Sequence, residues 1–315
     1  MKKLLITRSL PDATLAAARA RFDVTQREAD RGLTPAEAAT ALRDFDAILP
    51  TLGDQFTADA FRGGIRCGVL ANFGVGYNHI DVAAAKAAGV AVSNTPDVVT
   101  DATADIGMTL ILSTCRRAGE GERLVRAGKW TGWAPTQMLG THVTGKTVGI
   151  IGMGRIGQAV ARRCYFGFDM PVLYFNRSPK PIDLPARQVD GLDALMRQAD
   201  IVVVTVPGGG PNTHLIDAAA LSAMKKTGIF INIARGDVVD EAALIVALRA
   251  GQIAGAGLDV FEKEPCVPEA LRCLDNVVVL PHLGTATLEV REAMGQMALD
   301  NIIAWDMGQT LPQAV

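Results

Sequence analysis

The stretch TVGIIGMGRIG, residues 147–157, decides the fold class of this 315-residue chain. Its first half is apolar and rich in β-branched residues, which is typical of a buried strand. Its second half carries Gly152, Gly154 and Gly157 in the spacing GxGxxG. In this spacing the first glycine permits a tight turn, the second lets a pyrophosphate approach the backbone, and the third lets a helix pack closely on the strand. The stretch therefore predicts a dinucleotide-binding strand–turn–helix unit, with phosphate at the start of the helix.

Short apolar segments alternate with Ala-rich helical segments on both sides of this stretch. Such alternation is typical of parallel sheets covered by helices on both faces. We therefore expect an α/β fold with two doubly wound parallel-sheet domains: a Rossmann dinucleotide-binding domain over residues 99–287, and a discontinuous flavodoxin-like substrate domain over residues 1–98 plus 288–315. Residues 100–128 are expected to form one long helix, and residues 288–308 another. The strands are expected at residues 4–7, 47–49, 68–71 and 90–93, and then at 147–151, 172–175, 201–206, 229–233, 255–259 and 277–280.

Charge and composition exclude several classes of protein. The chain has 31 basic and 33 acidic side chains and a formal net charge of −2. A nucleic-acid binder needs a concentrated basic surface, so we expect no nucleic-acid partner. No apolar run approaches the length that spans a bilayer, and the N-terminal apolar run is too short for a signal peptide. The five cysteines include no CxxC pair, and the histidines lack metal-like spacing, so we expect a cytoplasmic protein without a metal site or a membrane partner.

The residues after the second expected strand bear on the choice of nucleotide. An NAD site usually has an acidic residue about 20 positions after the glycines, where it binds the ribose 2′-hydroxyl. This chain has NRSPK at residues 176–180, without a carboxylate. Asn176, Arg177 and Ser178 offer an amide, a guanidinium and a hydroxyl, which suit a 2′-phosphate. A solvated basic loop would have the same composition. We expect NADP(H) to be preferred over NAD(H).

Three further polar motifs follow expected strands: NIARG at residues 232–236, DVFEKEP at 259–265 and PHLG at 281–284. The carboxyl ends of parallel strands share one edge of the sheet, the edge at which ligands bind in open α/β sheets. Taken singly, Arg235 could form a surface ion pair, Glu264 could be a solvated acid and His282 could be packed against backbone. Taken together with the glycine stretch, they predict a reaction site.

The three side chains suit the reduction of a 2-oxo acid by hydride. Such a reaction needs a proton donor, and histidine titrates near neutral pH. A carboxylate bonded to the second ring nitrogen favours the imidazolium and fixes the tautomer. Arginine can bind a planar carboxylate through two parallel hydrogen bonds. We therefore expect Arg235, Glu264 and His282 to converge as the catalytic residues, with His282 as proton donor.

In order and spacing, these motifs resemble the D-isomer-specific 2-hydroxyacid dehydrogenase family, and within it the glyoxylate/hydroxypyruvate reductases. The resemblance covers nearly the full length of the chain. It implies NADPH-dependent reduction of a small 2-oxo acid, glyoxylate or hydroxypyruvate, to the 2-hydroxy acid, in a homodimer. It also implies that Arg235 binds the substrate, that His282 is the acid and base, and that Glu264 is its partner.

Two more stretches resemble the reductase branch. Residues 72–81, NFGVGYNHID, are similar to the family's substrate loop, in which the backbone N–H groups of Val75 and Gly76 hold the carboxylate. Residues 130–135, WTGWAP, are similar to a segment in which a tryptophan reaches the active site of the neighbouring subunit. This role transfers to Trp133, although a dimer-interface tryptophan without substrate contact is an equal alternative.

The resemblance also implies the remaining cofactor contacts. It places Asp259 near the nicotinamide carboxamide and Thr103 facing the cofactor. Residues 207–211, PGGGP, should flank the adenosine but depart from the family pattern by having three glycines. The expected cofactor-binding residues are Thr103, Gly152, Gly154, Arg155, Ile156, Gly157, Asn176, Arg177, Ser178, Pro207, Thr213, Ile233, Ala234, Asp259 and Gly284.

Two alternatives stay open. The first is an NAD-linked 2-hydroxyacid dehydrogenase, of the D-lactate type or another. The second is a non-enzymatic, corepressor-like dinucleotide sensor that keeps the fold. Catalytic efficiencies that favour NADH would indicate the first, and no consumption of NADPH with glyoxylate, hydroxypyruvate or pyruvate would favour the second.

Overall fold

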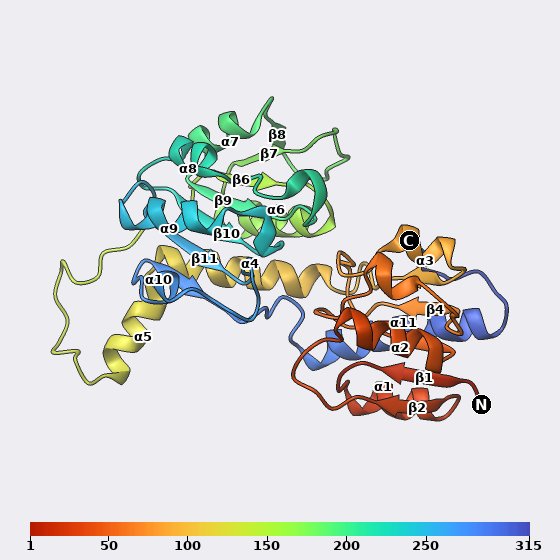
Figure 1. Cartoon of the computed structure of the whole chain (residues 1–315). Helices are drawn as coiled ribbons and strands as arrows, with labels where there is room; N and C mark the ends of the chain where they lie inside the picture. Colours follow the sequence, from red (N-terminus) through yellow and green to blue (C-terminus); the bar gives the residue numbers. More distant parts are fainter. The chain divides into compact units, whose positions relative to one another are not determined.

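The computed structural model describes all 315 residues, and the chain folds into two compact units (Figure 1). Unit 1 comprises Met1–Val99 and Thr285–Val315, and unit 2 comprises Thr100–Gly284. The unit boundaries expected from the sequence were 98/99 and 287/288, close to the observed 99/100 and 284/285. No helix combines the length and the apolar content that a bilayer crossing requires.

Unit 1 is built on a five-stranded parallel sheet in the order β2-β1-β3-β4-β5. Helices α2 and α3 cover one apolar face, which contains Leu42, Phe56 and Leu70, and α1 and α11 cover the other. Helix α11 comes from the far end of the chain and packs against α1, β3 and β4, which makes the unit discontinuous in sequence. Its elements are β1 (Lys3–Ile6), α1 (Asp12–Arg19), β2 (Asp23–Gln26), α2 (Pro35–Asp44), β3 (Ala47–Leu49), η1 (Ala58–Phe61), β4 (Val69–Ala71), α3 (Val82–Ala87), β5 (Ala91–Ser93) and α11 (Leu288–Asp306).

Unit 2 is built on a seven-stranded parallel sheet in the order β12-β11-β10-β9-β6-β7-β8. The chain order reverses direction at β6, as it does in doubly wound sheets that bind a ligand at this switch point. Its elements are α4 (Thr100–Cys115), α5 (Ala118–Arg126), β6 (Val148–Ile151), α6 (Arg155–Phe168), β7 (Val172–Phe175), β8 (Ala186–Gln188), α7 (Leu192–Gln198), β9 (Ile201–Val204), η2 (Gly210–Asn212), α8 (Ala218–Ala223), β10 (Ile229–Asn232), η3 (Gly236–Val238), α9 (Glu241–Arg249), β11 (Gly255–Leu258), α10 (Glu269–Arg272) and β12 (Val277–Val279).

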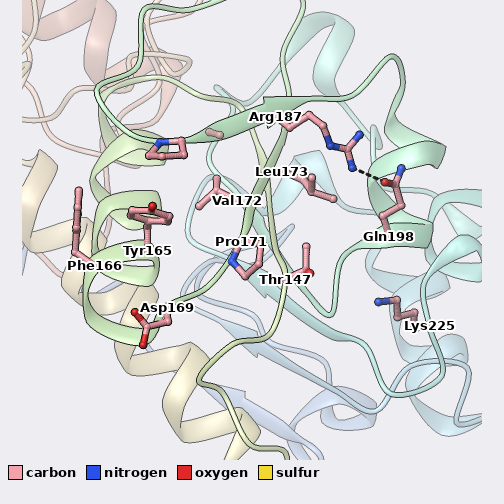
Figure 2. A pocket seen from close by; sticks show the side chains of 12 residues that line it. Thr147, Tyr165, Phe166, Asp169, Pro171, Val172, Leu173, Arg187, Gln198 and Lys225 are labelled. Atoms are coloured by element: carbon pink, nitrogen blue, oxygen red, sulfur yellow. Dashed lines mark hydrogen bonds between the residues drawn. The ribbon is translucent and has the colours of Figure 1, made fainter.

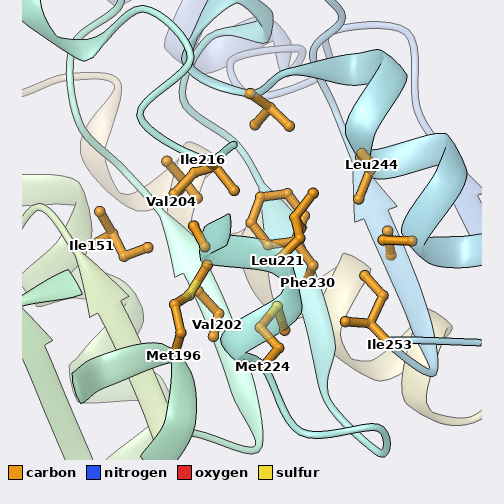
Figure 3. Packing of buried hydrophobic residues seen from close by; sticks show 14 of the residues in the cluster. Ile151, Met196, Val202, Val204, Ile216, Leu221, Met224, Phe230, Leu244 and Ile253 are labelled. Atoms are coloured by element: carbon orange, nitrogen blue, oxygen red, sulfur yellow. The ribbon is translucent and has the colours of Figure 1, made fainter. Parts of the chain in front are cut away.

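Helices bury both faces of the unit 2 sheet. Figure 3 shows one of these faces. There Phe230 of β10 lies in one apolar cluster with Leu221 of α8, Met224 at the end of α8 and Leu244 of α9. On the other face, α4 and α6 pack against each other and against the strands. Every residue of β6, β9, β10 and β11 is buried. Polar side chains are therefore confined mainly to the loops beyond the strand ends.

Both parallel sheets agree with the expected fold class, but two expectations from the sequence were wrong. Strands β2 and β8 were not expected; they are short edge strands with the mixed sequences DVTQ and ARQ. The unit 2 sheet therefore has seven strands and not six. One helix was expected over 100–128, whereas α4 ends at Cys115. Arg117 has a left-handed φ of 53°, and the N–H of Thr141 donates to the Cys115 carbonyl at 2.7 Å. This tertiary contact takes a carbonyl that a continuous helix would use.

Candidate functional site

The glycine loop between β6 and α6 has the geometry of a phosphate cradle. Gly152 has a φ of +96°, and a Cβ atom there would lie 2.7 Å from the Val206 side chain. A Cβ at Gly157 would lie 2.2 Å from the Gly152 carbonyl oxygen, so the helix packs directly on the turn. A Cβ at Gly154 would meet nothing within 4 Å, and no side chain caps the 14-residue helix α6. The loop is therefore open where a pyrophosphate would approach, and these residues fit a dinucleotide.

The first turn of α6 continues this surface. Arg155 is exposed and Ile156 is half-buried, while Gly157 is buried under the turn. An arginine on the first turn adds positive charge to the helix N-terminus, which already favours an anion. The sequence-predicted residues of this loop therefore lie together around one backbone turn.

The segment after β7 carries the residues expected to bind a 2′-phosphate. Arg177 and Ser178 are exposed, and no carboxylate occurs between Phe175 and Lys180. The Asn176 side chain, by contrast, is engaged within the protein. Its Oδ1 accepts from the Met153 N–H at 3.2 Å, and its Nδ2 donates to the Ser178 carbonyl at 2.7 Å. Asn176 thus joins the glycine loop to the segment that carries Arg177.

The remaining residues expected to contact the cofactor lie in loops of unit 2. Pro207 and Thr213 are exposed in the loop after β9, and Ile233 and Ala234 are buried directly after β10. The Thr103 hydroxyl lies on α4 and donates to the Gly284 carbonyl at 3.2 Å. Thr103 and Gly284 are therefore neighbours although 181 positions separate them.

Arg235, Glu264 and His282 follow three adjacent strands. Arg235 comes after β10, Glu264 after β11 and His282 after β12, and the sheet order places these strands side by side. Because all three strands are parallel, their carboxyl ends lie at the same edge as the glycine loop. The structure therefore brings the three predicted side chains to one edge of one sheet.

Glu264 and His282 are in direct contact. Nδ1 of His282 lies 2.8 Å from Oε2 of Glu264, and Oε1 of Glu264 accepts from the Phe261 N–H at 3.1 Å. Burial raises the pKa of Glu264, but the hydrogen bond and charge of His282, with smaller contributions from Phe261 and Arg235, outweigh it and leave the pKa below its usual value. Glu264 is therefore an ionised acceptor, so Nδ1 of His282 is the donor and Nε2 is left for a substrate.

Asp259 has a role that sequence reasoning missed. Its Oδ1 accepts from the Leu283 N–H at 2.6 Å and its Oδ2 from the Gly284 N–H at 2.9 Å. The His282 N–H donates to the Asp259 carbonyl at 2.9 Å, and His282 adopts a left-handed φ of 56°. Burial raises the pKa of Asp259, while the two N–H donors and His282 oppose the shift. The Asp259 side chain therefore holds the turn that presents the imidazole.

Arg235 is partly buried, and the carboxylates of Glu264 and Asp237 lie near its guanidinium. One end of its guanidinium, Nη1, donates to the Ala234 carbonyl at 2.6 Å. Burial lowers the pKa of Arg235, and the charges of Glu264 and Asp237 raise it. The remaining N–H groups of the fork are available for a planar anion such as a carboxylate.

The expected substrate loop lies after β4 in unit 1. The Asn72 side-chain amide donates to the carbonyls of Gly74 and Gly76 at 2.9 and 3.0 Å, and the Asn94 amide donates to the Val75 carbonyl at 2.8 Å. The side-chain amides of Asn72 and Asn94 thus donate to the carbonyls of three consecutive residues of this loop. The N–H groups of Val75 and Gly76 donate to no backbone carbonyl.

Trp133 lies in the long segment that follows α5, which extends away from the body of unit 2 (Figure 1). Its side chain is 80% exposed, and Trp130, Leu139 and Val125 are also more than half exposed. Helix α5 has no buried residue. These exposed apolar side chains lie within residues 125–139 of the chain.

A cavity of about 1040 Å³ lies at the opposite, amino-terminal edge of the unit 2 sheet. Figure 2 shows that Tyr165 and Phe166 line one side of it, Pro171 its floor, and Arg187 and Lys225 other parts of its wall. None of the predicted site residues lines it. The chain also has no group of three or more His, Cys, Asp or Glu side chains arranged for a metal ion.

Known proteins resemble this chain over most or all of its length. Residues 108–284 match the family model of the D-isomer specific 2-hydroxyacid dehydrogenase NAD binding domain. A glyoxylate reductase of Thermococcus onnurineus is 43% identical over 99% of this chain and 95% of its own length. The crystal structure of an NADPH-dependent glyoxylate/hydroxypyruvate reductase from Sinorhizobium meliloti, in complex with NADP and malonate, is 35% identical with a TM-score of 0.90, over 100% of this chain and 96% of that one.

Proposed function

We propose that this chain, which belongs to the D-isomer-specific 2-hydroxyacid dehydrogenase family and is an oxidoreductase, reduces small 2-oxo acids such as glyoxylate and hydroxypyruvate with NADPH. The observation that carries the proposal is the 2.8 Å contact between His282 and Glu264, at the sheet edge that also holds Arg235 and the glycine loop. The names of the Thermococcus and Sinorhizobium relatives support the substrate class.

In the proposed reaction each polar side chain has one task. Bound NADPH supplies the hydride that the substrate's carbonyl carbon receives. Nε2 of His282 gives its proton to the carbonyl oxygen, which becomes the hydroxyl group of the product. Glu264 accepts the Nδ1–H of His282 and compensates the positive charge of the imidazolium. Arg235 binds the substrate carboxylate and orients the carbonyl group. The backbone N–H groups of Val75 and Gly76 are proposed as further carboxylate donors.

The preference for NADPH is proposed from the segment after β7. Exposed Arg177 and Ser178 offer a cation and a hydroxyl, and no carboxylate is present to accept from a ribose 2′-hydroxyl or to repel a 2′-phosphate. Because Asn176 ties this segment to the glycine loop, the backbone of Arg177 is held near the end of β7, and its side chain is exposed.

A homodimer is proposed from the exposed segment after α5. A second copy of the chain would cover Trp130, Trp133 and Leu139, which are 54%, 80% and 69% exposed. Sedimentation of the wild type and of Trp133→Ala, with KM values for each 2-oxo acid, tests this. A change in association indicates an interface residue, and a change in substrate selectivity indicates substrate contact. If neither changes, Trp133 has neither role.

The central experiment follows NADPH absorbance with glyoxylate, hydroxypyruvate and pyruvate, and repeats the series with NADH. We expect turnover with NADPH and the first two substrates. A preference for NADH with pyruvate would instead indicate an NAD-linked dehydrogenase of the D-lactate type. NADPH binding without consumption of any substrate would favour a dinucleotide sensor.

A further inference from the structure

The three-glycine segment after β9, residues 208–210, is joined by hydrogen bonds to the turn that carries Arg235. Oδ2 of Asp237 accepts from the Gly209 N–H at 2.6 Å, and the Asp237 carbonyl accepts from the His214 N–H at 2.8 Å. The Ile216 N–H donates to the Val238 carbonyl at 3.0 Å. Three hydrogen bonds therefore join the loop after β9 to the turn after β10, and two of them end on Asp237.

Gly208 lies directly against the side chain of Arg235. A Cβ atom at Gly208 would lie 2.8 Å from both Cβ and Cγ of Arg235, and 2.5 Å from Oδ1 of Asp237. Real Cβ atoms do not approach other heavy atoms this closely, so only glycine fits here without a shift of its neighbours. The next residue, Gly209, has a left-handed φ of +75°, which also favours glycine.

We propose that Asp237 is a positioning residue for Arg235: by binding the Gly209 N–H it holds the Gly208 backbone against the aliphatic stem of the arginine and so fixes the direction of the guanidinium. The proposal rests on the proposed function, because it takes Arg235 to be the group that binds the substrate carboxylate. The stem is confined by Gly208, and Nη1 is confined by its bond to the Ala234 carbonyl. Together these contacts leave the Arg235 guanidinium little rotational freedom. Binding of a carboxylate therefore costs less conformational entropy than it would with a mobile arginine.

The negative charge of Asp237 also stabilises the charged form of Arg235. Burial lowers the pKa of Arg235, and the carboxylates of Glu264 and Asp237 raise it. Glu264 is committed to His282 and the Phe261 N–H. Asp237 is therefore a compensating charge for Arg235 that lies outside the pair formed with the imidazole.

The test compares Asp237→Ala, Asp237→Asn and a matched control, Asp193→Ala, whose carboxylate pairs with Arg197 on the surface of α7. In Asp237→Ala we expect KM for glyoxylate to rise about tenfold while kcat changes less than about threefold, because a mobile guanidinium weakens binding of the carboxylate. Asp237→Asn keeps an acceptor for the Gly209 N–H and should restore most of the affinity. KM values in Asp237→Ala equal to those of Asp193→Ala would overturn the proposal.

A chemical readout separates this proposal from the proposed function. Phenylglyoxal modifies arginine side chains, and peptide mass spectrometry reports the rate at Arg235 alone. We expect faster modification of Arg235 in Asp237→Ala and Gly208→Ala than in the wild type or Asp193→Ala. If the wild type reduces no 2-oxo acid but this rate difference is found, positioning by Asp237 stands and the proposed function fails. If the rates are equal, the positioning role is refuted whatever the activity.

Discussion

The two edges of the unit 2 sheet use polar side chains in different ways. At the carboxyl edge, Asp259 accepts from the Leu283 and Gly284 N–H groups, which follow the next strand. Glu264 contacts Nδ1 of His282 and accepts from the Phe261 N–H of its own loop. These bonds orient the imidazole of His282. At the amino edge, Arg187 donates to Gln198 at 2.6 Å (Figure 2), and Lys225 pairs with Asp200 at 2.7 Å. The amino-edge charges are satisfied by neighbours that hold secondary structure together.

The difference shows that volume alone does not identify a functional site. The amino edge has a cavity of about 1040 Å³, which is ample for a small ligand. The ion pair at this edge, Lys225 with Asp200, contains no imidazole, whereas the carboxyl edge has His282 paired with Glu264. The carboxyl edge has this pair because parallel strands end there beside the switch point at β6.

His282→Ala should abolish most of the activity. The variant removes the proposed proton donor, and loss of a general acid costs about 10²- to 10⁴-fold in kcat. The Kd for NADPH, measured by fluorescence titration, should stay close to the wild-type value because the glycine loop is untouched. Near-full activity in this variant would refute the proposed mechanism.

Glu264→Gln should lower kcat by about 10²-fold and should also change the pH dependence of stability. The pKa of Glu264 is lower in the folded protein than its usual value, so the ionised carboxylate stabilises the fold above about pH 4.3, and this contribution is lost as the pH falls through the folded value. In urea titrations the wild type should therefore be more stable than the variant at pH 6, and the difference should vanish in acid. A difference that grows on acidification would contradict the ionised pair.

Arg177→Ala should reduce the ratio of kcat/KM for NADPH to that for NADH by about tenfold, because a charge-assisted bond to the 2′-phosphate is lost. Arg187→Ala is the matched control, since Arg187 is an exposed arginine of the amino edge. Its ratio should equal that of the wild type. An unchanged ratio in Arg177→Ala would remove the basis for the proposed NADPH preference.

Lys225→Met should leave kcat and KM unchanged and should cost only about 0.5 kcal/mol of stability, as partly exposed ion pairs do. Burial raises the pKa of Asp200, but Lys225 and the Thr147 N–H outweigh it and leave the pKa low. The pair therefore stabilises the fold above about pH 3.9, and the difference between wild type and variant should disappear below that pH. A change in kcat/KM with glyoxylate would show that the amino edge takes part in function.

Much of the fold and part of the site were predictable because the signals are local or follow from topology. The turn itself requires glycine at 152, where φ is +96°, and at 157, where a Cβ atom would meet the Gly152 carbonyl. The meeting of Glu264 with His282 followed from parallel strands that share an edge. The edge strands β2 and β8 were not predictable from their mixed, short sequences, and the end of α4 at Cys115 depends on a contact with Thr141.

Local signals in the amino-acid sequence specify the succession of buried strands and helices, the glycine turn at β6 and the polar residues that follow each strand. Apolar periodicity and backbone steric limits act over a few residues, so they can be recognised in the linear chain. Three contacts depend instead on the packed fold: Asp259 holds the His282 turn, Asn176 binds the glycine loop, and Asp237 binds the Gly209 N–H. These bonds join residues 23 to 28 positions apart, and their distances and angles exist only after the strands have packed.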